Sequence, residues 1–176
     1  MRYYSLLLSF LLFSCKDALD TAVAADSYTE IKKALSIDPA ALENYAAQGK
    51  PIYVNKDNTA ANPITYKVAT LGRVLFYDKN LSVNNGFSCA SCHKQEFAFG
   101  DTAVSSLGVD NGRTIRHSMR LINSRFANEA KFFWNERAAS LEAQTTMPIQ
   151  DHLELGFSGQ TGRGNMTSLI TKLGGI

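Results

Sequence analysis

The stretch Cys89-Ala90-Ser91-Cys92-His93 decides how the rest of this 176-residue sequence is interpreted. Two thiols separated by two residues and followed directly by an imidazole form the attachment pattern for c-type haem. In that pattern the thiols add to the haem vinyl groups and the histidine becomes an axial ligand of the iron. The sequence contains three cysteines and three histidines, so chance seldom produces this order. We predict one covalent haem c, attached at Cys89 and Cys92 and ligated by His93.

Three other functions of a Cys-x-x-Cys pair remain alternatives at this point. Half of a zinc site would need a second Cys or His pair at a finger-like spacing, which the sequence lacks. A thioredoxin-type dithiol is expected beside a βαβ pattern, whereas Lys94-Gln95-Glu96 and the residues around the motif are loop-like. A disulfide across two intervening residues would be strained.

The N-terminus resembles an export signal. Arg2 precedes an apolar run over residues 6–13 that is too short to span a bilayer. The run ends in Leu12-Phe13-Ser14-Cys15, which is similar to a bacterial lipobox and predicts lipidation of Cys15. The alternative is an ordinary signal peptide cleaved after residues 22–25. We assign residues 1–25 to the signal and predict a periplasmic protein that meets the membrane through its lipid anchor alone.

Composition favours a single small domain. Lys and Arg number 18 against 16 for Asp and Glu, and the charges are scattered, so nucleic acid is not an expected partner. Apolar residues make up 45% of the chain and occur in short patches separated by Asn, Gly, Ser and Asp. This distribution predicts a mainly α domain with short helices and long loops.

Apolar periodicity places the helices. Residues 28–48 predict two short helices that meet near residues 36–38, with Pro39 in the first turn of the second helix. Residues 66–77 predict a core helix, and a last helical region runs from Ala138 to about Thr145, ended by Pro148.

Two further segments are predicted to be irregular. Asn84-Asn85-Gly86 forms a turn that leads into the haem motif, and residues 97–116 form a long loop of the kind that usually serves function. The predicted organisation is therefore a signal over residues 1–25, N-terminal helices and a connecting loop over 26–65, and a haem domain over 66–176.

Several stretches resemble the N-terminal haem domain of the bacterial di-haem cytochrome c peroxidases, the group that includes the MauG enzymes. They comprise residues 71–78, Leu81-Ser82, 88–93, 132–138 and Leu155-Gly156, and the resemblance extends over roughly residues 66–160. It implies a cytochrome c-like fold and a haem at which hydrogen peroxide is cleaved.

The resemblance also implies a distal pocket of three residues. The family has a Trp, a Gln ten residues later and a Glu ten residues beyond that, and Trp134, Gln144 and Glu154 reproduce both spacings. Glu154 would move the proton from one peroxide oxygen to the other, Gln144 would position the peroxide, and Trp134 would form a rigid wall. Taken singly, each residue could instead be an ordinary core or surface residue.

The sequence departs from the family at three places. Val109 stands where many members have a histidine that caps the iron, so an open site is expected, with His117 and His152 as less favoured replacements. His117 also replaces an asparagine that helps to hold calcium, so calcium is not carried over. The chain ends at Ile176, where the family continues into a second haem domain, and we expect a truncated product or fragment.

Three functions therefore compete. The first is a haem peroxidase that reduces hydrogen peroxide to water with electrons from a small donor protein, either a cytochrome c or a cupredoxin. The second is an electron carrier in which Met119, Met147 or Met166 completes the iron coordination. The third is an inactive remnant of a di-haem peroxidase.

Overall fold

The computed structural model describes residues 29–59, 61–128, 131–160 and 162–175. Its backbone contacts divide the chain into two compact units, with the division between Ala41 and Leu42. That division falls inside the segment 26–65, which the sequence analysis treats as one piece. The predicted signal segment, including Cys15, lies outside the described residues.

In the first unit, residues 29–35 are helical and the helix ends at Ser36, whose φ is +53°. The second helix predicted from Pro39 is wrong: residues 39–41 form a turn and a bend. The Asp38 carboxylate accepts the backbone N–H of Ala40 at 3.0 Å. Such a local side-chain bond satisfies the backbone without a helix, which explains why the apolar spacing is misleading here.

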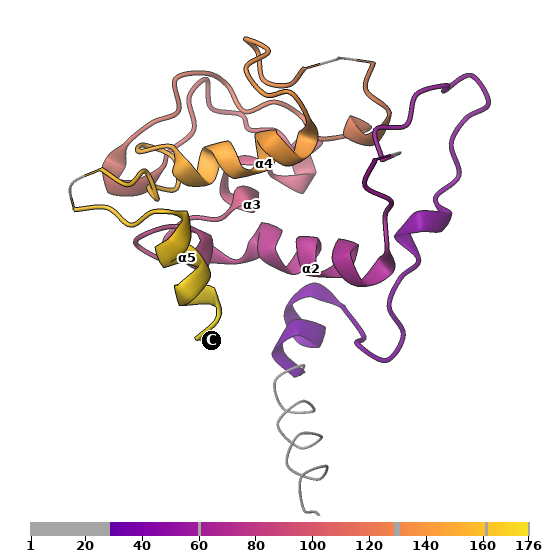
Figure 1. Cartoon of the computed structure of the whole chain (residues 1–176), viewed down its shortest axis with the longest axis horizontal. Helices are drawn as coiled ribbons and strands as arrows, with labels where there is room; N and C mark the ends of the chain where they lie inside the picture. Colours follow the sequence, from indigo (N-terminus) through magenta and orange to yellow (C-terminus); the bar gives the residue numbers. More distant parts are fainter. Residues whose placement is uncertain (1–28, 60, 129–130, 161, 176) are drawn as a thin grey trace, which may run out of the picture. The chain divides into compact units, whose positions relative to one another are not determined.

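The second unit is built from short helices joined by long loops, as predicted (Figure 1). Its α-helices are α2 (Tyr66–Tyr77), α3 (Cys89–Cys92), α4 (Leu141–Gln150) and α5 (Met166–Leu173). Its 3-10 helices are η1 (Tyr45–Ala47), η2 (Lys79–Leu81), η3 (Gln95–Phe97), η4 (Val109–Asn111) and η5 (Ser124–Phe126). The described residues contain only isolated β-bridges and no named strand. No helix within these ranges is both long and apolar enough to cross a membrane.

Helix α2 has the predicted bounds because both of its ends carry a cap. The Thr65 hydroxyl accepts the N–H of Val68, and the chain leaves the helix at Asp78, whose N–H bonds the carbonyl of Leu75. Helix α2 contacts α3, the single helical turn that carries the two cysteines, and Figure 1 draws α3 between α2 and α4. The predicted turn before α3 is present, with Asn85 at a φ of +55°.

Helix α4 corrects the prediction at both ends. It begins at Leu141, because Ala138 pairs with Phe132 in an antiparallel bridge and Ser140 caps the first turn. It continues through Pro148 to Gln150. A proline removes the hydrogen bond of its own nitrogen and crowds the preceding turn, but its carbonyl still accepts. The Pro148 carbonyl accepts the N–H of Asp151, so the helix ends after the proline instead of before it.

The core of the second unit is small and lies where α4, α5 and the turn after α4 meet. Its buried members are Leu81, Ile149, Leu155, Phe157 and Leu169. Helix α5, which the sequence analysis missed, supplies Leu169. A local signal for this helix exists, since Asn165 and Ser168 form a capping box directly before the apolar positions.

The long loop after the haem motif is organised by the buried side chain of Asp101. Its carboxylate accepts the Lys94 ammonium at 2.8 Å and the Ser106 hydroxyl at 2.7 Å, and the Ser106 hydroxyl also bonds Ser118. Burial raises the pKa of Asp101, but these bonds and the N–H groups of residues 102 and 103 outweigh burial and hold it well below its ordinary range. The loop is therefore fixed in large part by polar contacts.

Two glycines give opposite expectations for replacement by alanine. A Cβ on Gly108 would lie 1.9 Å from the carbonyl oxygen of Leu153 and 2.9 Å from that of Glu154, whereas a Cβ on Gly72 in α2 would meet nothing within 4 Å. We predict that Gly108→Ala lowers the free energy of unfolding by about 1–3 kcal/mol. Gly72→Ala raises it by about 0.5–1 kcal/mol.

Urea unfolding followed by circular dichroism measures both changes in the same protein background. Equal effects of the two replacements would show that the loop at Gly108 does not pack against the turn at residues 153–154.

Candidate active site

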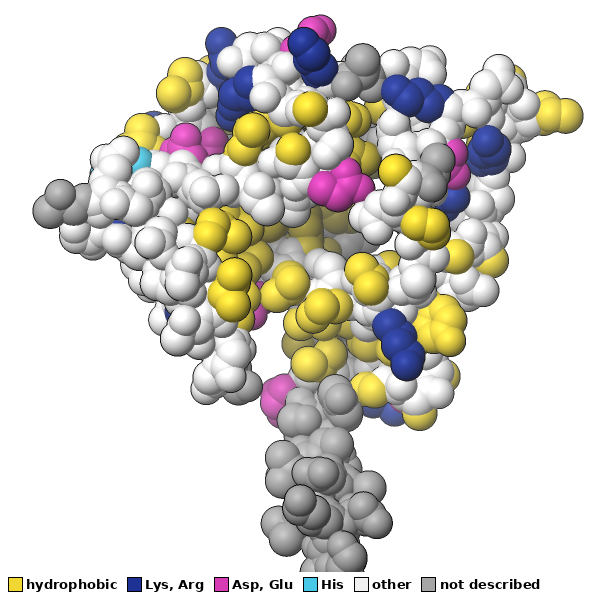
Figure 2. Space-filling view, viewed as in Figure 1, with side chains coloured by type: hydrophobic (Ala, Val, Ile, Leu, Met, Phe, Trp, Pro, Cys, Tyr) yellow, Lys and Arg dark blue, Asp and Glu magenta, His cyan; other side chains and the backbone are white. Residues whose placement is uncertain are grey.

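One cavity of about 400 Å³ brings together all six residues that the sequence analysis singled out for the haem site. Cys89, Cys92 and His93 line it together with Trp134, Gln144 and Glu154. Figure 2 shows a hollow between α4 and α2 with hydrophobic side chains around it. Residues 45 positions apart in the sequence, such as Cys89 and Trp134, therefore share one concave site.

Helix α3 and His93, which follows it, form one side of the cavity, called the first side below. The Ser91 hydroxyl accepts the N–H of Ser88, and His93 ends the helix with its N–H bonded to the carbonyl of Cys89. The Nδ1 atom of His93 lies 2.8 Å from the carbonyl oxygen of Phe99. A carbonyl can only accept, so Nδ1 carries the proton and Nε2 keeps its lone pair for a metal ion.

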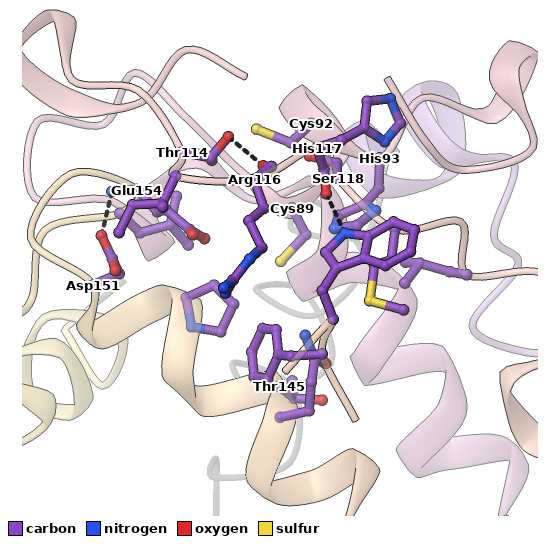
Figure 3. Close-up of a pocket in the computed structure, with 18 of the residues that line it drawn as sticks. Cys89, Cys92, His93, Thr114, Arg116, His117, Ser118, Thr145, Asp151 and Glu154 are labelled. Atoms are coloured by element: carbon purple, nitrogen blue, oxygen red, sulfur yellow. Dashed lines mark hydrogen bonds between the residues drawn. The ribbon is translucent and has the colours of Figure 1, made fainter. Parts of the chain in front are cut away.

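The two cysteines are free thiols at the cavity wall, and Figure 3 shows both of their sulfur atoms. Burial raises the pKa of each thiol. A thioredoxin-type dithiol requires the opposite shift, because its attacking thiol must ionise readily. A zinc site would also need a second Cys or His pair at a finger-like spacing, which the sequence lacks. These observations disfavour two of the three alternatives for the cysteine pair.

The residues present fit a c-type haem. Two free thiols stand one helical turn apart, an imidazole whose Nδ1 is oriented by the Phe99 carbonyl follows them, and the cavity falls in the ordinary size range of cofactor sites. The remaining wall combines polar side chains with aromatic and apolar ones, which include Phe76, Phe87, Phe133 and Leu121. Such a wall suits a flat hydrophobic ring.

The other three predicted residues come from the segment around α4. Trp134 precedes the helix and donates its indole N–H to the carbonyl of His117 at 2.8 Å, while the side chain remains 59% exposed. Gln144 lies in the first half of α4, and Glu154 lies in the turn that follows the helix. In Figure 3, Glu154 and His93 lie on opposite sides of Cys89. The ten-residue spacings thus deliver three side chains to the same cavity.

Glu154 has an unusual protonation equilibrium. Burial is the largest cause and the negative charge of Asp151 adds to it, so the pKa of Glu154 rises to about 7 although Arg137 opposes the shift. The Arg137 guanidinium stacks 3.5 Å from the centre of the Phe133 ring, which holds its charge at this wall. A carboxyl group with a pKa near neutrality can both accept and release a proton under ordinary conditions.

The three positions considered for a side chain that caps the iron lie in different surroundings. Val109 is 1% exposed and is not among the residues that line the cavity. His117 lines the cavity, but its Nε2 lies 2.8 Å from the carbonyl oxygen of Asp101. The Nδ1 of His152 lies 3.0 Å from the Ser158 hydroxyl, and this residue does not line the cavity.

Two charged residues of the cavity were missed in the sequence analysis. Arg116 extends its side chain into the cavity in Figure 3, and Asp151 lies in the turn that carries Glu154. No fixed spacing to the haem motif marks either residue. The local signal for Asp151 is weak, since an aspartate after a helix is common in turns.

Comparison with known proteins identifies the family of this chain. The family model for the di-haem cytochrome c peroxidases matches residues 66–174. The methylamine utilization protein MauG of Methylophilus methylotrophus is 31% identical over 113 residues, which cover 64% of this chain and 31% of that protein. Cytochrome c551 peroxidase of Pseudomonas aeruginosa is 32% identical over 111 residues, covering 63% and 32%.

A solved structure gives the same result at the level of the fold. The crystal structure of a MauG-like protein associated with microbial copper homeostasis superposes with a TM-score of 0.62 at 30% identity, covering 72% of this chain and 36% of that one. The chain thus spans about a third of the length of the relatives it matches. The fold is cytochrome c-like, and the match over well over half of its residues makes this chain a member of the di-haem cytochrome c peroxidase family.

Proposed function

We propose that this chain forms the peroxide-cleaving haem site of a cytochrome c peroxidase. The net reaction takes hydrogen peroxide, two electrons and two protons to two molecules of water. The observation that carries the proposal is the arrangement of one cavity, with two thiols and an imidazole on one side and a carboxyl group of raised pKa on the other. The first side supplies attachment points and an iron ligand for a haem, and the second side supplies a carboxyl group that can transfer a proton.

On the first side, the free thiols of Cys89 and Cys92 would hold one haem c through thioether bonds, and His93, with Nδ1 bonded to the Phe99 carbonyl, would bind its iron through Nε2. When bound there, the haem supplies a redox-active iron at which peroxide is reduced. The hydrogen bond from His93 Nδ1 to Phe99 fixes the plane of the imidazole and makes it a better electron donor.

On the second side, Glu154 moves the proton. In its ionised form it takes the proton from one peroxide oxygen and then returns it to the oxygen that leaves as water. Gln144 offers both an N–H donor and a carbonyl acceptor, so it can orient the peroxide. Trp134 forms a rigid wall, with its indole held by the His117 carbonyl.

The electron carrier is the second candidate, and Met119 is the residue that favours it. Met119 lines the cavity, whereas Met147 and Met166 do not. The backbone of Met119, however, hydrogen-bonds the His93 ring and opposes the lowering of the His93 pKa that burial causes. The Met119 backbone is therefore engaged with the ring of the residue that would bind the iron.

The electrons come from a small redox donor protein, either a cytochrome c or a cupredoxin. Both donors act outside the cytoplasm, where c-type haem is attached, so periplasmic export and lipid anchoring at Cys15 are part of the proposal. The relatives are about three times as long as the stretch that this chain shares with them. A domain equivalent to the rest of those proteins would be a second source of electrons for this site.

The first prediction concerns the haem. Co-expression with a c-type maturation system should give a polypeptide that keeps its haem after denaturation, and replacing both Cys89 and Cys92 by alanine should abolish this.

The ferric optical and EPR spectra of the matured chain should be high-spin. A low-spin spectrum with a sulfur-to-iron charge-transfer band that Met119→Leu removes would instead establish the carrier.

The second prediction concerns Glu154. In the matured chain, Glu154→Gln should keep the haem but slow the single-turnover reaction with peroxide by about a hundredfold or more, because the proton carrier is lost. Stopped-flow spectroscopy measures this without an electron donor. Glu142→Gln is the matched control, since Glu142 is exposed on α4 and does not line the cavity. Equal rates in the two variants would remove Glu154 from the mechanism.

The third prediction concerns pH. Because Glu154 must be ionised to accept a proton and its pKa is about 7, the peroxide rate constant should rise by about tenfold per pH unit below 7. Above 7 it should level off. Stopped-flow rates from about pH 5 to about pH 9 test this, and the rising limb should be absent in Glu154→Gln. A flat profile in the unsubstituted chain would contradict the assignment.

A further inference from the structure

The turn that presents Glu154 is built around a second carboxylate. Asp151 follows α4 directly, and its Oδ1 atom accepts the backbone N–H of Leu153 at 2.8 Å and that of Glu154 at 3.2 Å. Its backbone carbonyl accepts the N–H of Gly156 at 2.8 Å. Figure 3 shows Asp151 bonded beside Glu154 at the same wall of the cavity. One residue thus closes the turn from both of its ends.

The rest of the turn leaves Glu154 little backbone freedom. The Glu154 carbonyl accepts the N–H of Val109 at 3.1 Å, and the neighbouring Leu155 is buried in the core. Gly108 packs so closely that a Cβ there would overlap the Leu153 carbonyl. The position of the Glu154 carboxyl group is therefore set largely by the turn that Asp151 closes.

Asp151 also places a negative charge beside Glu154, and both residues line the cavity. Other charged or titratable groups surround the turn. Arg137, Arg116 and Cys92 line the cavity with Glu154, whereas His152 and the Asp110–Arg163 ion pair lie by the turn outside the cavity lining. Of these groups, Arg137 is the one whose charge opposes that of Asp151 at Glu154. Two neighbouring carboxylates repel each other when both are ionised, so the charge of Asp151 favours the protonated form of Glu154.

We propose that Asp151 is a positioning residue of the peroxide site: it closes the turn that carries Glu154 and holds a second carboxylate beside the Glu154 carboxyl group. This proposal rests on the proposed function for the role of Glu154 as proton carrier. Burial is the largest cause of the raised pKa of Glu154 and the charge of Asp151 adds to it, so Asp151 contributes to the pH range in which the site works.

The two effects are separable because asparagine retains one of them. The side-chain oxygen of an Asn at position 151 can still accept both N–H groups, but the charge is gone. Alanine removes the charge and the hydrogen bonds together. Glu43→Gln serves as the control for loss of one carboxylate, since Glu43 is exposed and does not line the cavity.

The experiment compares the matured chain with Asp151→Asn, Asp151→Ala and Glu43→Gln. Two readouts are recorded against pH: the stopped-flow rate with peroxide, and the infrared band of the protonated Glu154 carboxyl group, assigned by its loss in Glu154→Gln. The infrared titration needs no turnover and reports on Glu154 even if the chain reacts slowly.

For Asp151→Asn we expect both midpoints to move to lower pH by about one unit, with the plateau rate above pH 8 within about threefold of the unsubstituted chain. Asp151→Ala should also lower the plateau, by about tenfold or more, because the turn is no longer closed. Glu43→Gln should move neither quantity.

The proposal is overturned if the midpoint of the infrared titration in Asp151→Asn equals that of the unsubstituted chain. This test does not need the alanine variant to fold, because asparagine can keep the hydrogen bonds of the turn. That outcome is distinct from failure of the proposed function. If Glu154→Gln reacts with peroxide at the full rate while the infrared midpoint still moves in Asp151→Asn, Asp151 controls Glu154 but Glu154 is not the proton carrier.

Discussion

Burial of Leu155 is the constraint on which the second side of the site depends. Its side chain belongs to the small core, its N–H bonds the Pro148 carbonyl, and its carbonyl accepts the N–H of Val83. A residue tied in this way cannot shift without breaking apolar and polar contacts together. The adjacent Glu154 is consequently held at the cavity wall, and its carboxyl group shares the low-polarity surroundings that raise its pKa.

The first side is held by polar contacts instead. The Phe99 carbonyl that orients the His93 ring lies in a tight loop closed by the bridge between Lys94 and Gly100. The next residue, Asp101, anchors this loop through its buried carboxylate. Buried polar groups are costly unless satisfied, and this network is extensively bonded, so it specifies one conformation for a long irregular segment.

These two supports give the cavity its chemical asymmetry. One side offers sulfur and nitrogen atoms that suit a haem, and the other offers a carboxyl group poised between its charged and neutral forms. A small unit can hold both because each functional residue sits next to an anchored one: His93 beside Lys94, and Glu154 beside Leu155. The site therefore relies on a few local clamps more than on a large core.

The sequence by itself determined helix α2, the helical class and the family, and it predicts the haem attachment residues, because these depend on short-range spacing and helix caps. It also supplied the register of Trp134, Gln144 and Glu154. Tertiary structure alone decided that these residues share a cavity with His93, that α4 continues through Pro148, and that burial beside a second carboxylate shifts the pKa of Glu154. Burial and through-space charge depend on residues distant in the chain, which no local pattern records.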